Sequence, residues 1–154
     1  MTAASSTPDP ELDAVRRRRA ELRETMGELE RALAAPASGR SAEWADGVRR
    51  ALVVLESDFR EHIAVTEGPN GLHQDIVAAA LRLSNGVERL TLEHGLITEQ
   101  VNNLLAWFSA PVSPEDIERL REGATSLLGL LVRHRQRGAD LIYEAFVVDV
   151  GGQD

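Results

Sequence analysis

The sequence predicts an all-α protein, an antiparallel four-helix bundle with a short extra helix between its second and third long helices. Three observations favour this fold. Apolar residues recur every three or four positions through four long segments, which is the spacing of one helix face. Short stretches rich in Gly, Pro and Ser separate these segments. Aromatic residues make up only 4% of the chain, so the core must be mainly aliphatic, which suits helix packing.

The first long helix is expected from Pro10 to about Ala35. Asp9 is a typical helix cap, Pro10 suits the first helical position, and Glu11 favours the positive end of the helix dipole. Residues 1–9 are expected to form a mobile N-terminus. The apolar face of this helix is Leu12, Val15, Leu22, Met26, Leu29 and Leu33. Arg19 occupies the position where this series should have another apolar residue.

The second long helix is expected from about Ser41 to Thr66. The breaker Gly68-Pro69-Asn70-Gly71 ends it, and a short helix from Leu72 to Leu83 follows. An interruption at residues 84–86 then leads into the third long helix, which runs to about Phe108, before Pro111.

The fourth long helix starts at the capping sequence Ser113-Pro114-Glu115-Asp116 and is expected to run to about Phe146. A chain of 154 residues can bury one core, so residues 10–148 are expected to form a single bundle domain and 149–154 a tail. Trp44 and Trp107 are expected in the core, at the end of the bundle that holds this capping turn.

Composition excludes several functions. The chain contains no cysteine, which removes disulfides, thiolate metal sites, iron–sulfur clusters and cysteine nucleophiles. Its net charge of −8 argues against nucleic-acid binding. No apolar run approaches membrane-spanning length, and the N-terminal sequence has no secretory signal, so we expect a cytoplasmic protein without a membrane partner.

Three histidines lie on the apolar faces of three different long helices. His62 continues the series of Leu52, Leu55 and Phe59, His94 lies among Leu90 and Ile97, and His134 follows Leu127 and Leu131. From the rise per residue, Arg19 and His94 lie roughly 22 Å, and His62 and His134 roughly 30 Å, from one end of the bundle. The sequence therefore predicts a shared pocket lined by these four side chains. His73 follows a turn and is expected at the surface.

At these histidines the chain resembles the hemerythrin-like (HHE cation-binding) family. Residues 59–68, FREHIAVTEG, are similar to its first His-x-x-x-Glu segment, and residues 90–101, LTLEHGLITEQV, to its Glu-His segment. Residues 131–146, LVRHRQRGADLIYEAF, are similar to its closing segment. The resemblance implies metal ligation by His62, His94 and His134 in a bundle, and a role in oxygen, nitric oxide or redox handling.

The remaining ligands depart from the family pattern, in which bridging carboxylates complete a diiron centre. Thr66, Thr98 and Gly138 stand four positions after the three histidines, where ligand-sized side chains would be needed. Glu67 and Asp140 are displaced around their helices, by about 100° per residue. A complete diiron centre is therefore not expected. Three imidazoles can hold a single Fe or Zn ion with one position open.

The three small residues should leave room near the histidines for a ligand or water, and Glu67, Asp140 and Tyr143 are expected to line the same pocket. Arg19 would repel a dication there and favour an anion, unless Glu67, Glu93, Asp140 or Glu144 neutralises it. The sequence thus leaves three functions open. The first is binding of a metal ion or small ligand, and the alternative is a metal-free, degenerate bundle that acts as a protein-interaction module. The third is a bundle that binds an organic ligand, or haem through one histidine. Nothing in the sequence supports a homo-oligomer.

Overall fold

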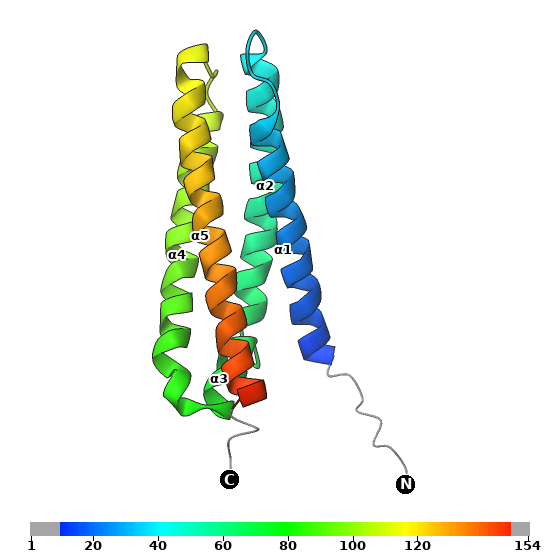
Figure 1. Cartoon of the computed structure of the whole chain (residues 1–154), viewed down its shortest axis with the longest axis vertical. Helices are drawn as coiled ribbons and strands as arrows, with labels where there is room; N and C mark the ends of the chain where they lie inside the picture. Colours follow the sequence, from blue (N-terminus) through cyan, green and yellow to red (C-terminus); the bar gives the residue numbers. More distant parts are fainter. Residues whose placement is uncertain (1–9, 149–154) are drawn as a thin grey trace.

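The computed structural model describes residues 10–148, apart from the side chains of 10–15, 18 and 148. Its four long helices run alternately up and down beside one another (Figure 1). They are α1 (Pro10–Ala34), α2 (Ser41–Glu67), α4 (Ser84–Phe108) and α5 (Ile117–Tyr143). The all-α prediction is confirmed for this part of the chain. The expected cap Asp9, the N-terminus 1–9 and the tail 149–154 lie outside the described residues, so those predictions stay open.

The shorter elements lie at the ends of the long helices. The short helix α3 (Leu72–Ala79) and the 3₁₀ turn η1 (Leu81–Leu83) connect α2 to α4, and η2 (Pro114–Asp116) precedes α5. At Ser113 the capping box is present, since its side chain and backbone both bond to Asp116. The α-helical hydrogen bonding of α5 ends at Tyr143, and a π-helical segment, η3 (Glu144–Val148), continues it. The prediction of a helix to Phe146 is therefore correct in its extent, but its last turn is a π-helix and not an α-helix.

Residues 84–86 do not interrupt the chain as expected, because they form the first turn of α4. A Cβ atom on Gly86 would lie 2.8 Å from a terminal carbon of Leu141. Glycine at this position lets α4 approach α5 closely. The residue that looked like a helix breaker in the sequence therefore serves helix packing instead.

The apolar core has two parts. The main cluster fills the space between the four long helices from Leu22 and Phe59 to Trp44 and Phe108. A smaller cluster closes the other end, where α3, the start of α4 and η3 meet. Its buried members are Leu72, Ile76, Ala80, Leu83, Val87 and Ala145. The buried histidines are absent from both clusters and form a polar layer between them.

Candidate metal centre

His62, His94 and His134 are brought together in this polar layer, as the sequence predicts. Their exposed fractions are only 8%, 2% and 3%. One ring nitrogen from each residue can be chosen so that all three atoms lie within 4.8 Å of one another. α2, α4 and α5 each contribute one ring, so the cluster joins three helices that are far apart in sequence.

The phenyl ring of Phe59 closes the cluster on the side of the main core. Its centroid lies 5.5 Å from that of His62, 5.7 Å from that of His94 and 6.1 Å from that of His134. Phe59 stands three residues before His62 and therefore on the same face of α2. An apolar floor of this kind keeps water from the three imidazoles on that side.

Carboxylates hold two of the rings from outside the cluster. Nδ1 of His94 lies 2.6 Å from Oε2 of Glu67, and Nδ1 of His134 lies 2.9 Å from Oε1 of Glu93. A carboxylate accepts hydrogen bonds, so Nδ1 carries the proton in both rings and Nε2 carries the lone pair. This carboxylate–imidazole arrangement is the one that orients histidine ligands in metal sites.

Two of the three inner nitrogens contact each other, and the third has no hydrogen-bond partner. Nε2 of His62 lies 3.3 Å from Nε2 of His134, while the buried Nε2 of His94 has no hydrogen-bond partner. Bonds of about 2.0–2.1 Å in a tetrahedral zinc site set ligand nitrogens about 3.3–3.4 Å apart. One pair is thus already at ligand spacing, and an inward shift of the third ring would complete the triangle.

The three imidazoles are neutral over the physiological pH range. Burial, and then the neighbouring His94 and His134, lower the pKa of His62 to about 3. Burial, together with His134 and His73, lowers the pKa of His94 to about 3. Burial and then the charge of Arg19 lower the pKa of His134 to about 4. Neutral imidazole is the form that binds a metal ion, so the net protonation of the three rings already suits ligation at neutral pH, and His62 needs only the tautomer with its proton on Nδ1.

A small cavity of about 30 Å³ lies beside the cluster. It is lined by Arg19, Leu22, His62, Thr66, Leu72, His73, Leu90, His134, Arg135, Gly138 and Ile142. A water molecule needs roughly 10–15 Å³ of such space, so the cavity has room for about two waters or a ligand of similar size. The room expected next to Thr66 and Gly138 is therefore present, but an organic ligand or haem would not fit without rearrangement.

Thr98 does not line this cavity, although the sequence grouped it with Thr66 and Gly138. The reason is helix direction. α2 and α5 run opposite to α4, so four residues after His62 or His134 leads away from the main core, whereas four residues after His94 leads back towards it (Figure 1). The α4 residue on the cavity side is Leu90, four residues before His94.

Asp140 and Tyr143 were wrongly predicted to line the pocket. Asp140 is exposed and accepts a hydrogen bond from Gln136, and the Tyr143 side chain is 57% exposed. Six and nine residues after His134 correspond to rotations of about 240° and 180° around the helix, so both point away from the cluster. Glu67 lies outside the cavity as well, but it contacts the outer nitrogen of His94.

His73 was wrongly expected at the surface. It is buried, stacks on His94 with ring centroids 5.4 Å apart, and contacts Thr91 Oγ1 through Nδ1 at 3.2 Å. An eight-residue helix after a Gly-Pro turn offers too few positions to define an apolar face, so periodicity could not indicate this burial. His73 lines the cavity beside the three clustered histidines.

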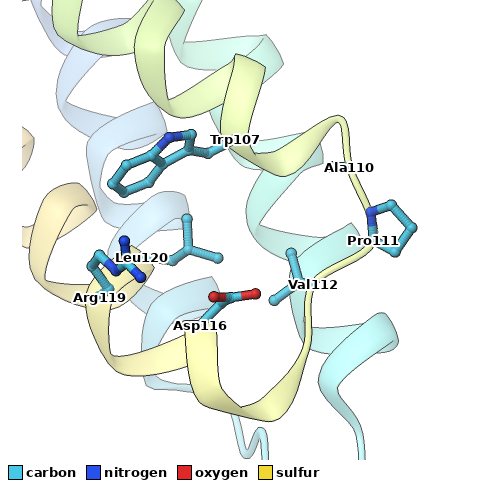
Figure 2. A pocket seen from close by; sticks show the side chains of 7 residues that line it. All are labelled: Trp107, Ala110, Pro111, Val112, Asp116, Arg119 and Leu120. Atoms are coloured by element: carbon cyan, nitrogen blue, oxygen red, sulfur yellow. The ribbon is translucent and has the colours of Figure 1, made fainter.

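A second hollow, of about 200 Å³, lies at the turn between α4 and α5 (Figure 2). Trp107, Asp116 and Arg119 are among its lining residues, and the Arg119 guanidinium lies 5.8 Å from the Trp107 ring centroid. Trp107 is 51% exposed, which corrects the expectation that it is a core residue, whereas Trp44 is buried as expected. This hollow is about 20 Å along α4 from His94 and contains no histidine.

No family model, curated protein or solved structure matches this chain in comparisons. The search for membrane-spanning helices, made over the described residues, finds none that is long and apolar enough.

Proposed function

We propose that the protein binds one divalent transition-metal ion, Zn²⁺ or Fe²⁺, through Nε2 of His62, His94 and His134. The observation that carries this proposal is the orientation of the rings. Carboxylates occupy the outer nitrogens of His94 and His134, and the inner nitrogen of His94 is buried without a partner. An unpaired buried acceptor costs roughly 1–3 kcal/mol, a cost that a bound cation would remove.

The carboxylates beside the cluster offset part of the charge of a dication. Glu67 and Glu93 each lie against a histidine, but the charge of Glu93 is shared with Arg137. Glu93 also pairs with Arg137 and has a side chain only 14% exposed, so its position is fixed from two sides. Three neutral ligands leave one coordination position open, and the adjoining cavity would admit water or another ligand of one or two heavy atoms.

A hemerythrin-like fold with an altered metal centre is the family assignment that fits this proposal. The buried histidines support it, but the carboxylates do not extend it to a diiron centre. Glu67 and Glu93 contact the outer nitrogens, whereas a bridge between two irons needs carboxylates on the inner side. Thr66 and Gly138 stand on that inner side and offer no carboxylate. Oxygen or nitric oxide handling would then depend on the open position of one ion.

Metal analysis of protein purified without a metal-affinity tag tests the proposal. We expect about one Zn or Fe per chain in the wild type and its loss in His134→Ala. His73→Ala is the matched control, because it removes a buried histidine that stacks on the cluster without belonging to the triangle of nitrogens. A metal-free wild type whose melting temperature does not respond to added Zn²⁺, Fe²⁺ or chelator would favour the metal-free interaction module instead.

A further inference from the structure

Four arginines surround a hollow next to the histidine cavity. Arg16, Arg19 and Arg23 recur at helical spacing along one face of α1, and Arg135 faces them from α5. The hollow measures about 540 Å³, and its remaining lining residues are Ala20 and Glu24. Four guanidiniums against one carboxylate make this region strongly positive in a chain whose net charge is −8.

Arg19 and Arg135 connect this hollow to the histidine site. Both also line the small cavity beside His62 and His134, so their side chains separate the two spaces. A guanidinium nitrogen of Arg19 donates to the backbone carbonyl of Arg135 at 3.4 Å, which ties α1 to α5 at this point.

Glu24 is the one carboxylate among the described residues that line the hollow. The ion pairs between described residues do not include Arg16, Arg19, Arg23 or Arg135. Nε of Arg135 is buried without a hydrogen-bond partner. Burial lowers the pKa of Arg135, and the nearby charges of Arg19 and Arg23 lower it further. A cluster of like charges with an unused buried donor is stabilised by an anion that accepts from several guanidiniums at once.

We propose that the hollow lined by Arg16, Arg19, Arg23 and Arg135 binds a small oxyanion such as a phosphate or carboxylate group. The oxyanion would accept hydrogen bonds from the guanidiniums of Arg19 and Arg135. The cavity of about 30 Å³ behind them has room for about two waters, so the oxyanion stays in the outer hollow. One consequence rests on the proposed metal function: an anion that neutralises Arg19 and Arg135 removes repulsion from the metal, so it should tighten metal binding.

Titration of inorganic phosphate into metal-free protein at low ionic strength, followed by calorimetry, tests the anion site independently of any metal. We expect saturable binding that weakens about tenfold in Arg135→Gln, since a charge-assisted hydrogen bond contributes about 1.4 kcal/mol or more. Arg23→Gln should weaken binding in the same direction. Because Arg23 is exposed, this second variant keeps the test valid if Arg135→Gln fails to fold.

Arg133→Gln is the matched control, since Arg133 lies on α5, is exposed and lines neither space. It should change the dissociation constant by no more than about twofold, through screened long-range charge alone. Absence of saturable binding up to about 10 mM phosphate would overturn the proposal, as would equal weakening in Arg133→Gln and Arg135→Gln. Phosphate binding by the metal-free protein alongside a wild type that retains no metal would refute the metal function while leaving the anion site intact.

Discussion

The Nε2 atoms of His62 and His134 lie 3.3 Å apart inside the bundle. His134 donates from Nδ1 to Glu93, so its Nε2 is an acceptor, and only one proton, on His62, can join the pair. That leaves Nε2 of His94 as the one inner nitrogen of the three that is an unpaired acceptor. This unsatisfied buried acceptor lowers the free energy of unfolding of the metal-free protein, and that effect can be measured.

His94→Leu should leave the metal-free protein close to wild-type stability. It removes an unsatisfied buried acceptor worth roughly 1–3 kcal/mol, which offsets loss of the hydrogen bond to the 31% exposed carboxylate of Glu67. His134→Leu should destabilise it by a similar amount, because it breaks contacts to both His62 and Glu93. Urea denaturation of both variants in the presence of chelator makes the comparison. Equal destabilisation by the two substitutions would contradict the assignment of His94 as the unpaired ligand.

Glu93→Gln should weaken metal affinity by about 10- to 100-fold, because the carboxylate that orients His134 and raises its basicity is replaced by a neutral amide. Competition with a chromophoric chelator measures the affinity. Glu99→Gln, an exposed residue on the same helix, is the control with the same change in charge. A similar loss in both variants would show that only long-range charge matters.

Gly138→Ala should raise the free energy of unfolding of the metal-free protein by up to about 1 kcal/mol, because alanine is favoured over glycine inside a helix. No atom lies within 4 Å of the Cβ that would be added, so the methyl group fits without strain. The same methyl group narrows the cavity that Gly138 lines and should weaken binding of a small ligand to the metal. Thermal melting tests the effect on stability, and ligand titration tests the effect on ligand binding. A lower melting temperature in Gly138→Ala would contradict the finding that there is free space around Gly138.

The stability of the metal-free protein should fall as the pH drops below about 6.5. The unfolded histidines titrate near their ordinary pKa of 6.5, whereas in the folded state the pKa is about 3 for His62 and His94 and about 4 for His134. The unfolded chain therefore takes up protons first as the pH falls. Each such histidine then lowers the free energy of unfolding by up to about 1.4 kcal/mol per pH unit. Stability above pH 6.5 is unaffected by these groups.

Denaturation between pH 5 and 7.5 measures this slope, and His94→Leu should make it shallower by the contribution of one histidine. A slope that is unchanged in His94→Leu would mean that the histidines do not stay neutral in the folded protein. Metal bound to the folded protein should stay bound down to about pH 4, where His134 begins to take up a proton, and should be released at higher pH only where the chain unfolds.

Helical periodicity, with the Gly- and Pro-rich breakers and the caps, predicted the four long helices and the three inward histidines. His62, His94 and His134 each occupy a position on an apolar face, and the sequence determines that face within one helix. Burial of His73 was not predictable in this way, because α3 is too short to show a face. The contacts of Glu67 with His94 and of Glu93 with His134 join different helices, so their partners could be identified only from the distances.

The wrong pocket assignments have a common physical cause. Closeness to a histidine along the chain was taken to mean closeness to it in space. Tyr143 and Asp140 follow His134 closely in sequence, yet helical rotation turns both towards solvent. Thr98 has the correct spacing, but α4 runs opposite to α2 and α5, so it lies on the far side of the histidine layer. Helix rotation and direction must both be known before residues one turn apart can be assigned to one pocket.

The proposed function requires that one metal ion binds between the three inner nitrogens. A crystal of the protein loaded with Zn²⁺, measured at the zinc absorption edge, tests it most directly. The account predicts a single anomalous peak about 2.0–2.1 Å from Nε2 of His62, His94 and His134. Absence of a peak there in a crystal grown with excess Zn²⁺, or a peak bound through other atoms, would contradict it.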